Sequence, residues 1–473
     1  MFTKTSRRTR IIATLGPATE SPEMIKKMIE AGVNIFRINM SHAKHDKVRE
    51  AVKLIRQISE KHITRVGIMM DTRGPEIRTG DVPKDLNLEA GQTIGLTVRG
   101  EKSAEEFSVD VNYDELVDEI REGDVVIIDN GTIELKVERK KKNQLVCKVL
   151  TPGTLKSRRH VNLPGVRVNL PALTQQDKED IKLGVELGVD WFAMSFVREP
   201  EDVMRLKAIL DYHNAPQKVV AKLEDQEGIR NLNEIVDAAD AIMVARGDLG
   251  IECPYEELPI IQRLMVKQCA KKGKPVIVAT HMLESMIQNP SPTRAEITDT
   301  ANAVYEQADA IMLSGETSIG QYPLKCVEMM DRIARRIERS GGAGYYENVE
   351  MHSKFAKLVK SAAVLAEECE ADALIVFTTS GIIARNAARL RLVSTPIFAF
   401  SNDESLLNQL PMYWGIHPSF LETSDDPEDN VSRAVKKLRE RNLLNVGDKV
   451  VAVTEVRIND RLVDTILMEE VEG

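Results

Sequence analysis

Short apolar runs alternate with amphipathic segments at the start of the chain. The apolar runs cover residues 10–17, 33–40 and 65–72. After the first run, Ser21 is a plausible helix N-cap, and Gly32 ends a segment with helical spacing of apolar residues. Continuous apolar strands separated by helices are typical of a parallel sheet covered on both faces. The first residues therefore predict repeated strand–helix units.

From about residue 79 the pattern changes to short alternating runs punctuated by glycine. A turn sequence at 129–131 (Asp-Asn-Gly) lies between the apolar run 125–128 and the alternating residues that start at Ile133. Such a turn between strands is a strong hairpin signal. We expect a small antiparallel β domain over 79–165, inserted into the α/β region, with the basic run 139–142 at an exposed hairpin tip.

The strand–helix alternation then resumes and supplies five more strands. They are predicted at residues 191–197, 218–224, 240–248, 275–280 and 309–315. Three strands before the insertion and five after it make eight, the number in a closed (β/α)8 TIM barrel. A doubly wound open sheet is the alternative fold, but no early G-x-G-x-x-G sequence supports it. We therefore predict an α/β protein with its barrel over 1–78 and 166–342.

A third domain is predicted after the glycine-rich segment 341–344. Residues 350–473 contain helical segments alternating with the strand-like runs ALIVFTT, PIFAFS and KVVAVTEV. This pattern indicates a smaller C-terminal α/β domain.

Composition narrows the class of protein and its partners. The chain has 473 residues, a net charge of −9 and only 4% aromatic residues, so we expect no nucleic-acid partner. No apolar run approaches the roughly 18 residues of a membrane span, so no membrane association is expected. Five scattered cysteines fit a reducing, cytoplasmic location. The basic segment MFTKTSRRT is interpreted as a short N-terminal tail rather than a transit peptide.

Polar residues occupy six of the eight predicted strand ends, more than packing alone requires. In a barrel, the carboxyl ends of the strands form the active site. The six ends carry Arg37, Asn39, Ser41 and His42; Asp71, Thr72, Arg73, Glu76 and Arg78; Lys222 and Glu224; Arg246, Gly247 and Asp248; Thr280 and His281; Ser314 and Glu316.

Lys222, Glu224 and Asp248 form the most informative of these groups. Lys222 and Glu224 alternate on a strand, so both face the same side. Two carboxylates on neighbouring strands suit Mg²⁺, which keeps waters and binds substrate oxygens. Lys222 and Arg37 add positive charge for phosphate, and Gly247 lets backbone N–H groups approach an anion. The group predicts magnesium-dependent phosphoryl transfer. The alternative, a purely structural Lys–Glu pair, would be costly beside two carboxylates without a ligand.

A second group combines carbonyl, hydroxyl and carboxylate oxygens with a single negative charge. It consists of Asn39, Ser41, Asp71 and Thr72. Such a set suits a weakly held monovalent cation better than a divalent one.

These residues lie in segments that together resemble the pyruvate kinase family. The segment VVAKLEDQEGI (219–229) is similar to the family's signature, and RINMSH, DTRGPEIRTG, MVARGDLGIE, ATHMLESM and IMLSGET follow the family's order. The resemblance runs from about residue 10 to residue 324. It implies a catalytic barrel, an inserted β lid, a regulatory C-terminal domain and the last reaction of glycolysis, from phosphoenolpyruvate and ADP to pyruvate and ATP. It also implies a homotetramer.

The resemblance further implies a role for each matching residue. Glu224 and Asp248 would bind Mg²⁺ (or Mn²⁺), while Lys222 and Arg37 would contact the phosphoryl group. Thr280 and the Gly247–Asp248 backbone would hold the substrate carboxylate, and Ser314 would take part in protonating the enolate. Asn39, Ser41, Asp71 and Thr72 would bind K⁺. His42, Arg78 and Pro17 would lie near the nucleotide.

Several positions depart from the family's pattern or select a subgroup within it. Glu76 stands where potassium-independent members carry lysine, so potassium dependence is expected. His281, Asp225, Ala43 and Ser318 replace the usual glutamine, asparagine, glycine and alanine. None of these changes removes a charged catalytic group, so activity is expected to survive.

The C-terminal domain carries a separate candidate site. FTTSGIIAR (377–385) resembles the family's effector-phosphate loop, but TEVRINDRLVDT (454–465) lacks the tryptophan and glycines of fructose 1,6-bisphosphate binders. A different phosphorylated effector at Thr378, Thr379, Ser380 and Gly381 is one interpretation, and a strand-to-helix turn with an N-cap is the other.

Two rival functions use the same barrel. A magnesium-dependent lyase or aldolase would need the carboxylate pair but not the nucleotide arginines or a lid. A catalytically inactive interaction module is disfavoured by the complete set of charged residues.

Overall fold

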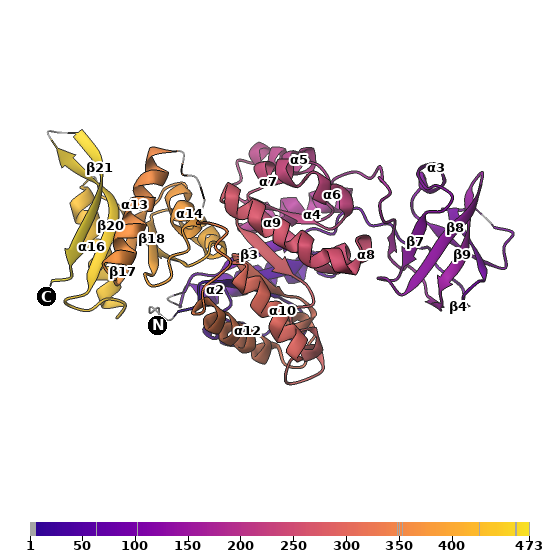
Figure 1. Cartoon of the computed structure of the whole chain (residues 1–473), viewed down its shortest axis with the longest axis horizontal. Helices are drawn as coiled ribbons and strands as arrows, with labels where there is room; N and C mark the ends of the chain where they lie inside the picture. The colour runs from indigo at the N-terminus through magenta and orange to yellow at the C-terminus, as the bar shows by residue number, and fades with distance from the viewer. Residues whose placement is uncertain are drawn as a thin grey trace.

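The chain folds into three domains that lie in a row in the computed structural model (Figure 1). The structure describes residues 6–62, 64–101, 103–347, 349, 351, 353–424, 426–458 and 461–472. A barrel forms the middle, the inserted β domain (the lid, residues 79–165) lies at one end, and the C-terminal domain lies at the other. The arrangement confirms the predicted fold class, while the boundaries at residues 78, 165, 342 and 350 remain predictions.

Eight parallel strands close the barrel in the order β1-β16-β15-β14-β13-β12-β3-β2. They are β1 Arg10–Thr14, β2 Ile35–Asn39, β3 Gly67–Asp71, β12 Trp191–Met194, β13 Lys218–Leu223, β14 Ala241–Ala245, β15 Val276–Ala279 and β16 Ala310–Leu313. β1 pairs with both β2 and β16, so the sheet has no free edge. Each predicted strand is present, and the open-sheet alternative is wrong.

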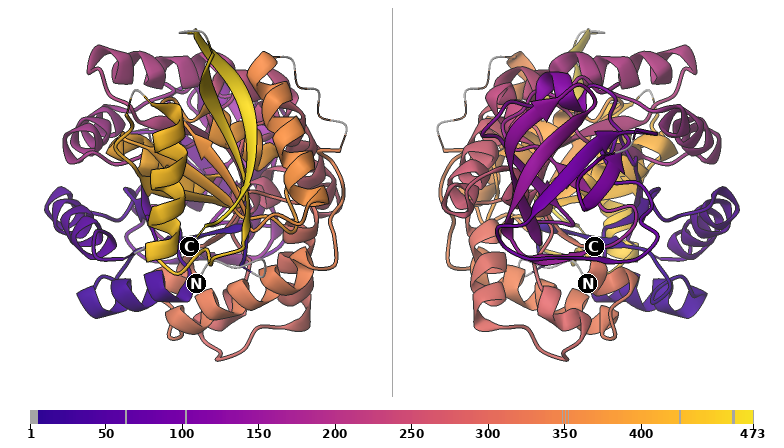
Figure 2. Two further views of the ribbon diagram at one scale, coloured as in Figure 1. Left: turned by 90° about the vertical axis from the view of Figure 1, so that its left-hand side faces the viewer. Right: turned by 90° about the vertical axis from the view of Figure 1, so that its right-hand side faces the viewer.

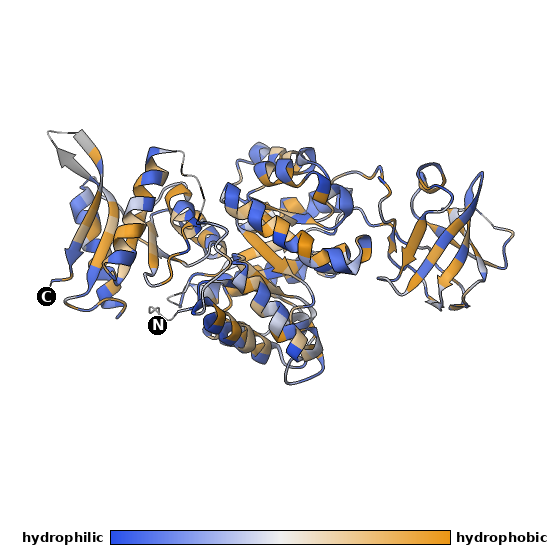
Figure 3. Cartoon of the chain, in the orientation of Figure 1, coloured by the Kyte–Doolittle hydropathy of each residue, from blue (hydrophilic) through white to orange (hydrophobic). Residues whose placement is uncertain are grey.

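Helices surround the strands, as the two end-on views show (Figure 2). The helices of the outer layer are α1 Pro22–Ala31, α2 His45–Ser59, α4 Gln175–Leu187, α5 Pro200–Tyr212, α7 Leu232–Ala238, α9 Leu258–Lys272, α10 Arg294–Tyr305 and α12 Pro323–Glu338. Short helices α6 Gln226–Arg230, α8 Arg246–Glu252 and α11 Gly315–Ser318 follow three of the strands directly. The predicted ends of α1 are confirmed, because Ser21 accepts a hydrogen bond from the N–H of Met24 and Gly32 has φ 111°. Apolar residues concentrate in the barrel strands, while the helices carry polar outer faces (Figure 3).

The lid is a separate β domain with its own core. Its strands are β4 Leu86–Leu88, β5 Thr93–Val98, β6 Phe107–Val111, β7 Val125–Ile128, β8 Ile133–Lys141, β9 Gln144–Thr151, β10 Gly153–Leu155 and β11 Val161–Asn162, with a short helix α3 Leu116–Glu119. The expected hairpin is β7–β8, with Asp129 and Asn130 at positive φ in its turn. β6 pairs with β5 in parallel, against the antiparallel expectation, because alternation of residues carries no information on strand direction.

The C-terminal domain has a five-stranded sheet in the order β19-β18-β17-β20-β21. Its elements are α13 Lys354–Glu368, β17 Ala373–Phe377, α14 Ile382–Arg389, β18 Ile397–Ser401, α15 Glu404–Gln409, β19 Ile416–Phe420, α16 Pro427–Glu440, β20 Lys449–Ile458 and β21 Arg461–Glu470. The three predicted strands are β17, β18 and β20. The sheet gains two strands that the sequence did not indicate, and the last of them, β21, runs antiparallel to β20.

Residues 6–9, which belong to the segment interpreted as a short N-terminal tail, are buried; residues 1–5 lie outside the described residues. The Arg7 side chain pairs with Asp331 of α12 at 2.9 Å. The Arg8 guanidinium lies 5.9 Å from the ring centroid of Trp414 in the C-terminal domain. Arginine can pack its apolar stem while its charge finds a partner, so a basic composition alone does not indicate exposure. This segment joins the barrel to the C-terminal domain.

Among the described residues, no helix is both long and apolar enough to cross a membrane.

Candidate functional site

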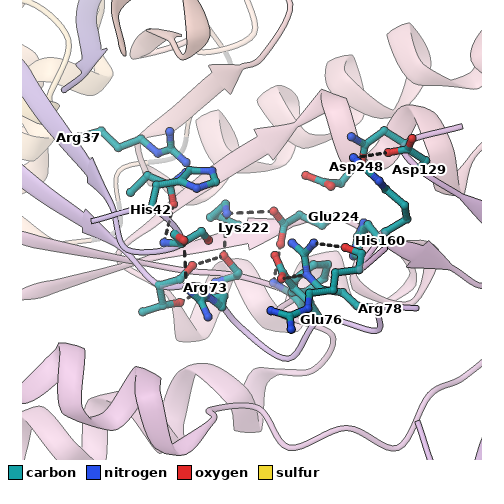
Figure 4. Close-up of a pocket in the computed structure, with 18 residues that line it drawn as sticks. Arg37, His42, Arg73, Glu76, Arg78, Asp129, His160, Lys222, Glu224 and Asp248 are labelled. Atoms are coloured by element: carbon teal, nitrogen blue, oxygen red, sulfur yellow. Dashed lines mark hydrogen bonds and ion pairs between the residues drawn. The ribbon is translucent and has the colours of Figure 1, made fainter. Parts of the chain in front are cut away.

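A cavity of about 500 Å³ opens where the carboxyl ends of the barrel strands face the lid. Its walls come from both domains and are mostly polar or charged (Figure 4). The lining residues are Arg37, Asn39, Ser41, His42, Thr72, Arg73, Glu76, Arg78, Asp129, Asn130, Arg158, Arg159, His160, Ser195, Phe196, Lys222, Glu224 and Asp248. The cavity therefore brings together the polar ends of β2, β3 and β13 with Asp248 of α8.

Lys222 lies at the centre of the charged network in this cavity. Its Nζ is 3.0 Å from Glu224 Oε1 and 3.1 Å from Asp71 Oδ1. It also donates a hydrogen bond of 2.7 Å to Ser195 Oγ. Burial opposes the charge of Lys222, but Asp71 and Glu224 outweigh it and raise the pKa of the ammonium. The group is held protonated, with its three N–H donors aimed at three oxygens.

Asp71 links Lys222 to the second cation of the site. Arg37 Nε donates to Asp71 Oδ2 at 2.6 Å, and Arg37 Nη1 donates to Thr14 Oγ1 at 3.1 Å. Burial alone would raise the pKa of Asp71, yet Lys222 and Arg37 lower it below its usual range. Asp71 thus fixes both cations at one wall of the cavity.

Glu224 is oriented by an unusual backbone conformation. The N–H of Phe196, which follows β12, donates to Glu224 Oε2 at 2.6 Å, and Phe196 itself has φ 53°. Burial raises the pKa of the Glu224 carboxyl to about 8, with Lys222 opposing the rise and Asp248 adding to it. Asp248 lies in the first turn of α8. Two neighbouring carboxylates, of which Glu224 is buried and Asp248 partly exposed, resist joint ionisation unless a cation lies between them.

Thr280 and Gly247 are joined at the next two strand ends. The N–H of Gly247 donates to Thr280 Oγ1 at 2.7 Å, and Thr280 has φ 66°. Arg246 donates to the Thr280 carbonyl at 2.6 Å and pairs with Asp299 at 2.7 Å. Ser314, at the end of β16, has a buried Oγ without a hydrogen-bond partner among the described residues. Gly247, Thr280 and Ser314 are not among the lining residues of the cavity.

Three of the four residues expected to bind a monovalent cation line the cavity. Asn39, Ser41 and Thr72 do so, and the N–H of Ser41 donates to Asn39 Oδ1 at 3.1 Å. Asp71 is completely buried behind them, and its side chain contacts Lys222 and Arg37. The structure therefore groups these residues but places the Asp71 carboxylate in the cation network.

Two of the three residues expected to lie near the nucleotide line the cavity. His42 and Arg78 line the cavity, whereas Pro17 does not. Arg78 Nε pairs with Glu76 Oε2 at 2.7 Å, and Arg78 Nη1 donates to the Arg158 carbonyl at 3.0 Å. Arg78 thus joins the barrel strand end to the lid.

Sequence reasoning missed two groups of lining residues. Ser195 and Phe196 follow β12, but the apolar run predicts a strand over 191–197 and so places both residues within it rather than at its end. The lid contributes Asp129, Asn130, Arg158, Arg159 and His160. The basic run at 158–160, between two β segments, was the one signal for the lid wall.

The four positions that depart from the family pattern do not line the cavity. Asp225 pairs with Arg198 at 3.0 Å and caps α6 by accepting from the N–H of Gly228 at 2.8 Å. His281 is exposed and lies 3.2 Å from Glu284. Ser318 offers its carbonyl to the N–H of Ala18 at 3.0 Å. Local side-chain partners thus account for Asp225 and His281, whereas nothing in the structure explains Ser318 or Ala43.

A second cavity, of about 520 Å³, lies in the C-terminal domain. Thr378 and Thr379 line it, together with Phe355, Phe377, Phe400, Asn402, Asn430 and Glu455 among others; Ser380 and Gly381 do not. Gly381, at φ 79°, is the N-cap of α14, and its N–H donates to Thr378 Oγ1 at 2.9 Å. No lysine or arginine of the described chain lines this cavity. In the nearby segment 454–465, Asn459 and Asp460 lie outside the described residues.

Comparison with known proteins identifies the family. Residues 6–327 match the model described as pyruvate kinase, barrel domain, and residues 356–467 match the one described as pyruvate kinase, alpha/beta domain. The chain belongs to the pyruvate kinase family. Plastidial pyruvate kinase 3, chloroplastic, of Arabidopsis thaliana is 41% identical over 450 residues, which cover 94% of this chain and 78% of that protein. Pyruvate kinase of Sporosarcina psychrophila is 38% identical over 466 residues, which cover 96% and 78%.

As a member of the pyruvate kinase family, the chain is a phosphotransferase. It transfers the phosphoryl group of phosphoenolpyruvate to ADP and yields pyruvate and ATP, the last step of glycolysis. The family uses Mg²⁺ and K⁺. Membership decides against the lyase and inactive-module interpretations.

Proposed function

We propose that the cavity between the barrel and the lid is the active site of this pyruvate kinase, with Lys222 at its centre. The observation that carries this assignment is the Lys222 ammonium held between Asp71 and Glu224, with Arg37 on the far side of Asp71. A buried cation fixed in this way suits an anion that binds from the open side of the cavity.

Lys222 and Arg37 are proposed to bind the phosphoryl group during transfer. Phosphoryl transfer requires positioning and neutralisation of charge more than covalent chemistry by the protein. Asp71 holds both side chains before substrate arrives, so little reorganisation is needed when negative charge develops on the phosphoryl oxygens. Lys222 thereby acts as the catalytic group, and Arg37 holds the oxygens.

Glu224 and Asp248 are proposed to hold Mg²⁺ (or Mn²⁺). The donor set fits, because Glu224 and Asp248 both line the cavity and two carboxylates leave the other coordination positions of Mg²⁺ to water and substrate oxygens. The bound cation would neutralise charge on the substrate and polarise its oxygens. The hydrogen bond from the Phe196 N–H holds Glu224 in place and supports this assignment.

The enolate end of the substrate is assigned to the neighbouring strand ends. The Gly247–Asp248 backbone and Thr280 would hold the carboxylate of phosphoenolpyruvate. Ser314, whose hydroxyl has no hydrogen-bond partner within the described chain, would belong to the path that delivers a proton to the enolate carbon.

A potassium site is proposed at Asn39, Ser41, Asp71 and Thr72. The Asp71 carboxylate, which also contacts Lys222 and Arg37, would supply the single negative charge of this site. Glu76, paired with Arg78, supplies no positive charge that could replace the cation. Potassium dependence follows from this arrangement.

The nucleotide is proposed to bind on the lid side of the cavity, at His42 and Arg78, with the turn at Pro17 nearby. We further propose a cytoplasmic homotetramer without nucleic-acid or membrane partners. The C-terminal cavity at Thr378 and Thr379 is proposed as an effector site for a phosphorylated ligand other than fructose 1,6-bisphosphate. With no basic side chain in its lining, such a ligand would depend on the N–H groups of Thr379 and Ser380, because those of Thr378 and Gly381 donate to the Phe400 carbonyl and to Thr378 Oγ1.

A coupled assay tests the proposed site. Pyruvate release from phosphoenolpyruvate and ADP is followed through lactate dehydrogenase, with and without K⁺. In Lys222→Met, loss of one preorganised charge should lower kcat by about 100-fold or more. Turnover equal to that of the parent would refute the assignment of Lys222.

A further inference from the structure

His160 belongs to the lid wall of the active-site cavity and has no role in the site proposed above. It directly precedes β11, and its backbone is held from two directions. Its carbonyl accepts from the N–H of Asp129 at 3.0 Å, and it forms an isolated antiparallel bridge with Arg78. The imidazole is therefore carried by a backbone fixed to both the lid and the segment that leads to it.

The ring of His160 is also positioned relative to the carboxylate pair. Its centroid lies 6.2 Å from that of Phe196, with the planes at 49°. The N–H of Phe196 is the group that orients Glu224. A shared neighbour thus ties the imidazole to the position of Glu224.

The nitrogens of this ring have no hydrogen-bond partner within the described part of the chain, in contrast to the neighbouring cations. Arg158 pairs with Asp81 through two contacts of 2.9 and 3.0 Å, and Arg159 pairs with Asp129 at 3.4 Å. Burial lowers the pKa of His160, with Asp248 and Glu76 opposing and Arg78 assisting. A neutral imidazole offers one N–H donor and adds no charge next to Arg78.

We infer that His160 is a nucleotide-binding residue that donates a hydrogen bond from the lid to the terminal phosphate of ADP. The inference rests on the proposed nucleotide site at Arg78. The barrel already supplies Lys222 and Arg37 for the phosphoryl donor, whereas His160 lies beside Arg78 on the lid side. A rigidly held donor without a partner is suited to an anion that arrives with the second substrate.

Paired variants separate hydrogen bonding from packing. His160→Leu keeps an apolar side chain against Phe196 but removes the donor, and His160→Gln retains a donor. Isothermal titration of the whole enzyme with ADP in the presence of Mg²⁺ gives the Kd. A hydrogen bond to a charged phosphate corresponds to about a tenfold or greater rise in Kd for His160→Leu, with a smaller rise for His160→Gln. The KM for phosphoenolpyruvate should stay within about twofold, because the inferred contact adds nothing to its binding.

Two further variants make the outcome specific. His213→Leu, at an exposed position after α5, should bind ADP like the parent, and melting curves check that every variant folds. An unchanged Kd in His160→Leu, or equal Kd values in His160→Leu and His160→Gln, would overturn the inference alone. An unchanged Kd in Arg78→Ala would overturn the nucleotide site on which it rests.

Discussion

Ser195 connects the proposed catalytic lysine to the proposed potassium site, and its removal tests that connection. Ser195 directly follows β12 and is only 2% exposed. Its Oγ accepts from Lys222 Nζ and donates to the Thr72 carbonyl, both at 2.7 Å. Ser195→Ala removes one of three oxygens around the ammonium and one donor from Thr72, while leaving both carboxylates in place.

The size of the effect follows from these contacts. A hydrogen bond to a charged group contributes about 1.5–3 kcal/mol, so kcat should fall about 10- to 100-fold if the bond holds Lys222 in its reactive position. Without Ser195, the ammonium is drawn toward Asp71 and Glu224, away from the phosphoryl group. The freed Thr72 carbonyl should also change the K⁺ concentration required for half-maximal activity.

The lactate dehydrogenase-coupled assay measures both effects in one K⁺ titration. Ser195→Thr, which keeps the hydroxyl, should recover most of the activity. Ser361→Ala is the matched control, because among the described residues that exposed hydroxyl bonds only to the Lys357 carbonyl within α13. A Ser195→Ala enzyme with parental kcat and K⁺ requirement would refute the positioning role.

Three further predictions concern the cation, pH and domain contacts. Glu76→Lys should abolish stimulation by K⁺ in the same assay, since the ammonium supplies the missing charge; continued dependence on K⁺ would contradict this. Burial raises the pKa of Glu252 from about 4.5 to about 7 in the folded state. Between these pH values Glu252 is protonated in the folded protein but ionised in the unfolded chain, so the protein loses stability as the pH rises through that window. Glu252→Gln should therefore be more stable than the parent at pH 8, by up to about 3 kcal/mol, and the advantage should shrink toward pH 5; an advantage in melting temperature that does not vary with pH would refute it. Arg391→Ala leaves the buried carboxylate of Asp309 without its partner at 2.8 and 2.9 Å and should lower the free energy of unfolding by about 3–5 kcal/mol; urea denaturation with an unchanged midpoint would argue against the pair.

Local patterns in the sequence determined the barrel and the centre of the site. Period-two and continuous apolar runs fix which segments are strands, and polar residues just after them fix what chemistry meets at one end of a closed barrel. The side-by-side placement of Lys222 and Glu224 follows from strand alternation alone, and their 3.0 Å contact agrees with it. Features that depend on only a few neighbouring residues can therefore be predicted from the sequence.

Contacts between residues that lie far apart in the sequence became known only from the tertiary structure. Ser195 gains its role because Thr72 and Lys222, from other strands, approach its hydroxyl. Residues 6–9 are buried because Arg7 pairs with Asp331 and Arg8 packs over the ring of Trp414. The basic composition of this segment could not indicate these partners. His160 reaches the cavity only because the lid lies at the end of the barrel where the carboxyl ends of the strands meet. The sequence by itself set which groups stand at the strand ends, whereas long-range packing decided which of them meet and which second-domain residues complete the site, because those contacts join positions with no local relation in the chain.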